Sequence, residues 1–190
     1  DFTFVLNKNI QCEMDTTTSP AKVEQAVYSV LQGVDSTPYS ITIDGTTTTF
    51  TSSNTNTKDI RDGLKSAIGS PSGITLANIG DSSFSIVKSS GTLSISASDG
   101  FGDDASQVVA DTVQNFSDLP QPAINGMIVE VIGTAANSFI NYYVKFSSDT
   151  GVWEETLEPG IKTTLDSATM PVLLIRTADG NFRLTEADGS

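Results

Sequence analysis

The sequence contains no histidine and a single cysteine, Cys12, among its 190 residues. Without histidine there is no Ser-His-Asp triad and no zinc site with histidine ligands. One cysteine cannot form an internal disulfide, and without a histidine partner we expect Cys12 to be a small residue in a strand. These absences argue against the common nucleophilic and zinc enzymes, and nothing in the sequence calls for a cofactor.

Basic residues are also scarce: 10 Lys and Arg stand against 23 Asp and Glu, for a net charge of −13. A nucleic-acid-binding domain needs a basic stripe that replaces the counterions of the phosphates, whereas the basic residues here are scattered and no two adjoin. An acidic surface favours solubility and repels DNA. No apolar run is long enough to span a bilayer. We therefore expect no specific nucleic-acid partner and no membrane partner.

Hydroxyl side chains are abundant, since serine and threonine make up roughly a quarter of the chain, well above common usage. Threonine favours strands, and serine favours turns, as do the 15 glycines. A chain of this length suits one large domain or two small ones. We predict a mainly β fold with one or two short helices, of the α+β class, built from many short strands.

Residues 19–116 are predicted to form a hairpin, a helix and a second hairpin. In the first hairpin, the alternating strand Tyr39–Ile43 leads through an Asp-Gly turn into the returning strand Thr46–Thr51. The second hairpin is predicted from Phe84–Val87 and Thr92–Ser96, on either side of a Ser-Ser-Gly turn.

The helix of this module is predicted over Asn56–Ile68. Asn56 can cap its first turn, with Asp59 three residues later as in a short capping box, and Gly69 can end it in the left-handed conformation. Gly63 weakens the interior by about 1 kcal/mol relative to alanine, so we expect the helix to form because it covers a sheet. Its apolar stripe consists of Ile60, Leu64, Ala67 and Ile68.

A boundary between two modules is predicted at residues 116–121, where Phe116-Ser-Asp-Leu-Pro120 precedes a second proline, Pro122. Short strands separated by turn signals follow, a pattern typical of a β-sandwich or barrel-like module. The strands expected outside the two hairpins are Phe2–Leu6 with a return strand over Ile10–Met14, Val27–Leu31, Met127–Ile132, Tyr142–Phe146, Val152–Leu157, Met170–Arg176 and Asn181–Leu184.

The chain reads as an internal piece of a longer protein, because Asp1 already lies in a strand-like sequence. If the chain is inserted in a larger fold, its ends must lie at neighbouring points, and the end strands Phe2–Leu6 and Val172–Arg176 are then expected to share one sheet, or at least to pack together. The predicted segments are strands leading from the parent core in 1–18, the hairpin-helix-hairpin module in 19–116, a β module in 117–170 and return strands in 171–190.

Glu154 and Glu155 are the candidates for carboxylate catalysis. A glycosidase holds two carboxyl groups about 5 to 9.5 Å apart across one sugar, whereas neighbours on a strand point to opposite faces. Glu155 and Asp166 can meet only through the tertiary fold. Exposed strand charges explain these acids more simply, so we predict no catalytic residues and no enzymatic activity.

Asp99, Asp103 and Asp104 lie in the Gly-rich loop Ser98–Asp104 and are weak candidates for a metal site. Calcium favours such oxygen-rich loops, but the spacing does not match an EF-hand and the bidentate glutamate is absent. A turn followed by a helix cap explains the acids more simply. The helix that Asp103 or Asp104 would cap is a short one carrying Val108, Val109 and Val113.

Tyr142, Tyr143 and Trp153 are the candidates for interaction, in an aromatic group that also includes Phe139. An exposed aromatic cluster can anchor a partner protein. On a strand, Tyr142 and Tyr143 face opposite ways, so at most one of them points into the core. We expect Trp153 to be buried.

Several short stretches together carry a family resemblance. They are Asp1–Asn9, Ser98–Asp103, Gln114–Pro120, Asn125-Gly126, Asn141–Phe146, Gly151–Thr156, Thr169–Pro171, Ile175-Arg176 and Asp179–Phe182. In order and spacing, this set resembles tail tubular protein B, the nozzle protein of short-tailed bacteriophages. The resemblance touches both ends and much of residues 98–182, and is thin over residues 15–97.

The resemblance implies a structural virion component, made in the host cytoplasm and placed in the phage tail. Family members are longer chains with a β-propeller core and inserted domains, of which this segment would be one. They form rings, as hexamers, below the adaptor ring, and the bore carries DNA during ejection. Implied partners are the adaptor ring, the tail fibre and copies of the intact protein, whereas the isolated chain is expected to be a monomer. The alternative is a carbohydrate-binding or carbohydrate-cleaving domain acting on host surface polysaccharide.

Overall fold

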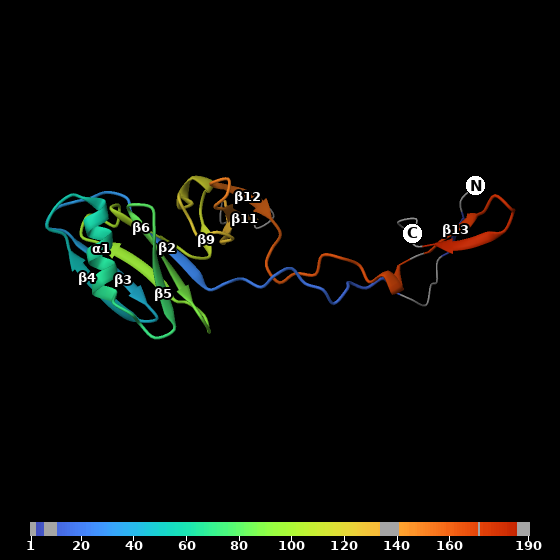
Figure 1. Ribbon diagram of the computed structural model, residues 1–190, viewed down its shortest axis with the longest axis horizontal. Coiled ribbons are helices and arrows are strands. Elements are labelled where there is room, and N and C mark those ends of the chain that lie inside the picture. Colours follow the sequence, from blue (N-terminus) through green and yellow to red (C-terminus); the bar gives the residue numbers. More distant parts are fainter. Residues whose placement is uncertain (1–2, 6–10, 134–140, 171, 186–190) are drawn as a thin grey trace. The chain divides into compact units, whose positions relative to one another are not determined.

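The computed structural model describes residues 3–5, 11–133, 141–170 and 172–185, and these contain many short strands and one α-helix (Figure 1). The predicted mainly β fold with a short helix is therefore confirmed. The chain divides into a central unit, Lys22–Glu158, and a terminal unit made of both end segments, 1–21 and 159–190. Within the described residues, no helix has the length and apolar character needed to cross a membrane.

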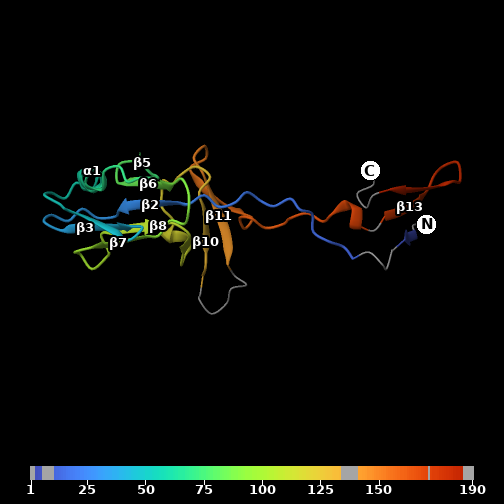
Figure 2. The same cartoon turned by 90° about the horizontal axis from the view of Figure 1, so that it is seen from below.

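Two sheets and the helix α1 (Thr57–Ile68) form one half of the central unit. One sheet has the strand order β5-β6-β2-β8 and the other β4-β3-β7, and all neighbours are antiparallel. In Figure 2, β5 and β6 of the first sheet are drawn above β3 and β7 of the second, and α1 packs against strands of both sheets. The strands are β2 (Gln25–Val30), β3 (Pro38–Ile43), β4 (Thr46–Thr51), β5 (Ile74–Ile79), β6 (Ser83–Lys88), β7 (Ile95–Asp99) and β8 (Ser106–Val109).

An apolar core fills the space enclosed by these two sheets and α1. Tyr28, Tyr39 and Phe84 are fully buried in it, and the rings of Tyr28 and Phe84 stack with centroids 5.1 Å apart. α1 contributes Ile60 and Leu64, at most 1% exposed, and burying each such side chain contributes roughly 1.5–3 kcal/mol. The predicted stripe is therefore confirmed at Ile60 and Leu64, whereas Ile68 is only half-buried and Ala67 is exposed.

A third sheet, with the order β12-β11-β10-β9, packs over a second apolar core. That core also receives Val27 of β2 and Val109 of β8, so β2 is buried on both faces. Burial on both faces explains why the sequence of β2 is not an alternating one. The elements of this part are β9 (Thr112–Val113), the 3-10 helix η1 (Phe116–Asp118), β10 (Ile128–Val131), β11 (Tyr142–Ser147) and β12 (Val152–Thr156).

The terminal unit pairs the two ends of the chain. β1 (Thr3–Val5) is antiparallel to β13 (Val172–Arg176), which pairs in turn with β14 (Phe182–Thr185). The prediction that the end strands share a sheet is thus confirmed for the described residues. The antiparallel course continues inward, where the Asp15 amide donates to the Thr164 carbonyl at 2.9 Å and the Ser19 amide to Ile161 at 2.8 Å. The short 3-10 helix η3 (Ser167–Thr169) belongs to the same unit.

The second predicted hairpin is wrong. β6 does not fold back on residues 92–96 but lies between β5 and β2, and β7 pairs with β3 in the other sheet. The chain between them crosses from one sheet to the other and buries Leu93 on the way. Both strands alternate in the same way, so their sequence pattern does not show which partner each one takes.

The predicted short helix over residues 103–113 is also wrong. Val108 and Val109 belong to β8, opposite Tyr28 and Val27 of β2, and Val113 belongs to β9. β-Branched valines favour strands, and the pairing with β2 decides between the two structures. Most of the two modules predicted on both sides of residues 116–121 lies in the same compact unit, whereas residues 19–21 and 159–170 belong to the terminal unit. The four-segment division stays a prediction.

Candidate functional site

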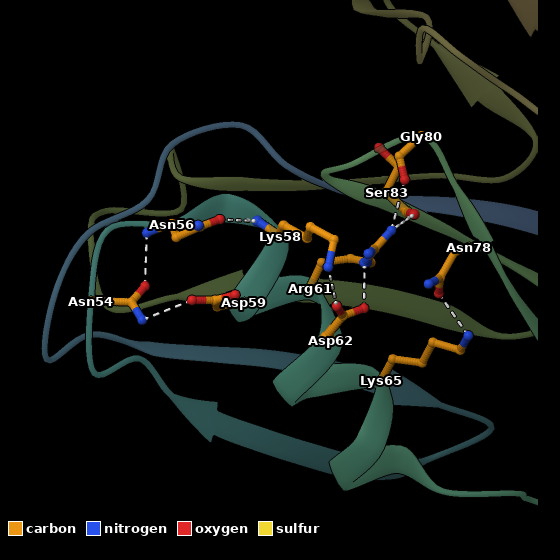
Figure 3. Close-up of polar contacts among 10 residues, drawn as sticks. All are labelled: Asn54, Asn56, Lys58, Asp59, Arg61, Asp62, Lys65, Asn78, Gly80 and Ser83. Carbon is orange, nitrogen blue, oxygen red and sulfur yellow. Dashed lines mark hydrogen bonds and ion pairs between the residues drawn. The ribbon is translucent and has the colours of Figure 1, made fainter.

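The N-terminus of α1 is held by a set of side-chain hydrogen bonds (Figure 3). The Asn56 side chain accepts from the Lys58 amide at 3.0 Å, as expected for a cap. Asp59 takes part in the cap through Asn54 and not through the predicted capping box. Its carboxylate accepts a hydrogen bond from the Asn54 side chain at 3.1 Å. Asn54 also accepts from the Asn56 amide at 2.8 Å, so it bridges the cap and the first turn.

Arg61, on the next turn, was missed by the sequence analysis. Its side chain is 2% exposed, and Nη1 donates to the carbonyls of Gly80 at 2.7 Å and Ser83 at 3.3 Å (Figure 3). Nε lies 2.8 Å from Asp62 Oδ1, as an ion pair without hydrogen-bond geometry. Arg61 thus ties α1 to the turn between β5 and β6. No sequence signal marks it, since an arginine on a helix is normally exposed.

Asp99 organises the loop between β7 and β8. Its Oδ1 accepts from the amides of Phe101 at 2.9 Å and Asp103 at 3.2 Å. Its Oδ2 accepts from the Ala105 amide at 3.1 Å and from both the amide and the hydroxyl of Ser106 at 2.9 Å. The Asp103 carboxylate in turn accepts from the Asp99 amide at 2.7 Å. Both oxygens of Asp99 therefore bond to groups of its own loop.

These bonds give Asp99 and Asp103 a structural role in the loop. Asp103 has a left-handed φ of 62°, a conformation that aspartate tolerates in tight turns, and it caps no helix. Over the described part of the chain, no three His, Cys, Asp or Glu side chains gather as a metal site would require. The hydrogen bonds of Asp99 explain the position of that carboxylate without an ion.

Trp153 lies in the second core, which confirms the expectation that it is buried. It is 9% exposed, its ring centroid is 5.3 Å from that of Phe146, and Nε1 donates to the Pro120 carbonyl at 3.1 Å. Buried indoles need such a partner. Trp153 therefore joins the segment after η1 to β12, and its ring is not displayed on the surface of this chain.

Tyr142 and Tyr143 face opposite sides of β11, as predicted. Tyr142 packs against the second core, whereas Tyr143 lies on the outer face, directly across from Glu130 of β10. The Tyr143 hydroxyl donates to Glu158 at 3.4 Å. Burial, together with the nearby charges of Glu130 and Glu158, raises the pKa of the Tyr143 hydroxyl. Tyr142 and Tyr143 are both half-buried, and Tyr143 is the one with a described hydroxyl contact to a carboxylate.

Glu154 and Glu155 are exposed neighbours on β12, in register with Lys145 and Val144 respectively. Their side chains point to opposite faces. Asp166 belongs to the terminal unit, where its carboxylate accepts from the Ala168 amide at 2.9 Å and caps η3. Glu154 and Glu155 therefore do not form a facing pair of carboxyl groups on β12.

Cys12 lies outside the named strands, so its expected strand position is wrong. Its side chain is exposed and its thiol donates to the Thr169 carbonyl at 3.4 Å. The neighbouring Glu13 amide bonds to the Thr169 hydroxyl at 3.0 Å. Both contacts join the two end segments of the terminal unit.

Comparison with known proteins identifies a family relationship that the geometry of these residues does not reveal. Residues 1–188 match a family model described as bacteriophage nozzle protein. Over 89 residues, the chain is 39% identical to a protein of Escherichia phage T7 named tail tubular protein gp12. That alignment covers 47% of this chain and 11% of the T7 protein, so the chain spans a small part of this relative's length.

Proposed function

This chain belongs to the bacteriophage nozzle protein family, and we propose that it serves as a structural module inserted in the tail nozzle. The family match over nearly all of its residues is the observation that carries the proposal. The partial similarity to tail tubular protein gp12 agrees with it. In this proposal, the module helps to form the tail tube used for DNA ejection and contacts neighbouring tail proteins.

The pairing of the chain ends supports the insertion. β1 and β13 pair antiparallel, and the segments inward of them are joined by the bonds Asp15–Thr164 and Ser19–Ile161. The central unit, 22–158, is therefore flanked by two segments that run side by side in opposite directions. A domain inserted in a larger fold leaves and re-enters it at neighbouring points, and this pairing brings the two end segments together.

The charge of the chain favours contacts with proteins over contact with DNA. At −13, with basic residues scattered along the sequence, it would repel the phosphates of DNA passing through a bore. We therefore place the module at the rim, against the adaptor ring or the tail fibre. The intact protein would form the ring, a hexamer, through parts outside this chain. The isolated chain should be a monomer in light scattering at micromolar concentration. A hexamer in that experiment would mean that the ring contacts lie within these residues.

We infer no catalytic role, because the exposed acids Glu154 and Glu155 point to opposite faces of β12. The alternative of a carbohydrate-cleaving domain predicts that the purified chain cleaves host polysaccharide. It also predicts that Glu155→Gln removes the activity while Glu154→Gln, its matched control, retains it. We expect no cleavage by the wild-type chain.

The proposed function is tested by removing the central unit from the full-length nozzle protein. A short glycine-serine linker would join Ala21 to Pro159, whose neighbours Ser19 and Ile161 already bond at 2.8 Å. We expect the shortened protein to fold and the particles to lack a complete, infectious tail. Particles that assemble and infect normally would contradict a structural role. Complete tails that fail only on polysaccharide-coated hosts would favour the carbohydrate alternative.

A further inference from the structure

Two segments connect the end strands to the central unit, residues 11–21 and 159–170, and they are called the neck (blue and orange in Figure 1). No residue of these two ranges is buried, and the apolar side chains of Met14 and Leu165 are 41% and 47% exposed. By contrast, all six residues of β2 in the central unit are buried. Because apolar burial is the main favourable contribution to folding, the neck gains little stability from it.

The pairing within the neck is interrupted. Its two isolated bridges join Met14 to Leu165 and Thr18 to Lys162, so three residues separate them on one segment and two on the other. One segment therefore has an extra residue, as in a β-bulge, and the ladder is locally disrupted. The sheets of the central unit differ from the neck, because β2 pairs in unbroken register with both β6 and β8.

Asp15 shapes the segment that contains the extra residue. Its carboxylate accepts a hydrogen bond from the Thr16 amide at 2.5 Å and another from the Thr17 hydroxyl at 3.1 Å. Both bonds lie within one segment of the neck. They order that segment locally but add no bond between the two segments.

Prolines limit the pairing at the inner end of the neck. The Ser19 amide donates to the Ile161 carbonyl at 2.8 Å. Pro20 and Pro159 come next toward the central unit, and a proline has no amide hydrogen with which to extend a ladder. Gly160, between Pro159 and Ile161, has a φ of 76°, a conformation that glycine adopts without strain. Neither proline can donate a further backbone bond toward the other segment.

These features are those of a segment that opens by itself. An isolated two-stranded ribbon is at best marginally stable in water. Proteins open locally where few apolar groups are buried and backbone bonds are exposed, with free energies far below that of global unfolding. The central unit holds two apolar cores, so we expect its inner strands to open only when the whole unit unfolds.

We propose that the neck is a conformational device that opens and recloses while the central unit stays folded. Opening breaks the backbone bonds between the two segments, such as those of Asp15 with Thr164 and Ser19 with Ile161. The two segments then act as separate linkers. In the nozzle, this freedom would let the central unit change direction as it meets a neighbouring tail protein. That use rests on the proposed function, whereas the opening itself is a property of this chain.

Hydrogen exchange followed by mass spectrometry tests the opening in the full 190-residue chain. Protection factors, which correct for the intrinsic exchange rate of each peptide, are compared between the neck and the strands β2 and β6. We expect the neck to be protected about 100-fold less or lower still, since its opening free energy lies far below the global value. Equal protection of the neck and β2 would overturn the proposal.

A variant of the neck shows whether its opening is independent of the central unit. Ser19→Pro removes the amide that donates to Ile161. We expect it to lower the protection of the neck about fivefold to tenfold, as for the loss of one or two hydrogen bonds, and to leave β2 unchanged. Ile60→Ala, at a residue 1% exposed in the central core, is the control and should lower the protection of β2 about 30-fold or more.

A fall in the protection of β2 on Ser19→Pro, by the same factor as in the neck, would show that the neck and the central unit open together. That result would also overturn the proposal. None of these outcomes bears on the place of the module in the tail, which the removal of the central unit tests separately.

Discussion

Gly63 of α1 packs directly against the ring of Phe50 on β4, and a Cβ atom built on the glycine would stand 2.3 Å from Phe50 Cζ. Glycine inside a helix costs about 1 kcal/mol relative to alanine. The close approach explains why the helix contains it, because a larger residue would push α1 off the sheet. The position of the helix over both sheets therefore depends on this one small residue.

Gly63→Ala is expected to destabilise the chain by about 1–3 kcal/mol, since overpacking against Phe50 outweighs the gain in helix propensity. Urea unfolding of both proteins would measure the change. Ser66→Ala, at an exposed position of the same helix, is the control and should change stability by about 0.5 kcal/mol or less. A Gly63→Ala variant more stable than wild type would show that the space between α1 and Phe50 accommodates a methyl group, against this prediction.

Arg61→Ala is expected to cost about 2–4 kcal/mol, because the carbonyls of Gly80 and Ser83 lose a charged donor in a buried setting. Lys58→Ala is its control on the same helix, where the exposed pair with Asp62 contributes about 0–1 kcal/mol. Thermal unfolding would compare them. Equal effects of the two changes would contradict the anchoring role of Arg61.

Asp62 should make stability fall in acid. Burial acts to raise its pKa, but the hydrogen bond from Lys58 and the charges of Arg61 and Lys58 outweigh it, so the pKa lies below the ordinary 3.8. A carboxyl whose pKa is lower in the folded state stabilises the fold above its unfolded pKa, and this contribution disappears as the pH falls through the folded pKa. Wild type should therefore exceed Asp62→Asn in stability at about pH 6 and lose that advantage progressively as the pH falls below the ordinary 3.8. A difference independent of pH in urea titrations would refute this assignment.

Asp99→Asn is expected to destabilise the chain by about 1–3 kcal/mol, because charged acceptors hold the amides of Phe101, Asp103, Ala105 and Ser106. Asp104→Asn, in the same loop, should have a small effect. Melting temperatures with and without calcium would test the ion hypothesis at the same time. A rise with calcium in wild type that Asp99→Asn abolishes would make the loop a metal site.

The secondary-structure elements that depend on local sequence patterns could be predicted from the sequence. The first hairpin, α1 with its stripe at Ile60 and Leu64, and the strands β10, β11 and β12 of the third sheet follow from alternation, helical spacing and turn residues. The partners of β6 and β8 did not follow, since non-local pairing is decided by burial on β2. The buried, anchoring role of Arg61 could not be predicted for the same reason, because its carbonyl partners come from a turn about 20 residues away in sequence. Of the aromatic candidates, alternation predicted that Tyr142 and Tyr143 diverge, but not that Glu130 and Glu158 flank Tyr143.

The most direct test of the central claim is a density map of the intact phage tail, with the position of this chain identified by a tag inserted in an exposed turn such as Asp44-Gly45. The account predicts that residues 22–158 form a module at the rim of the nozzle ring, joined to the core through β1 and β13 and in contact with another tail protein. A map in which these residues line the bore, or in which β1 and β13 enter the core at separate points, would contradict it.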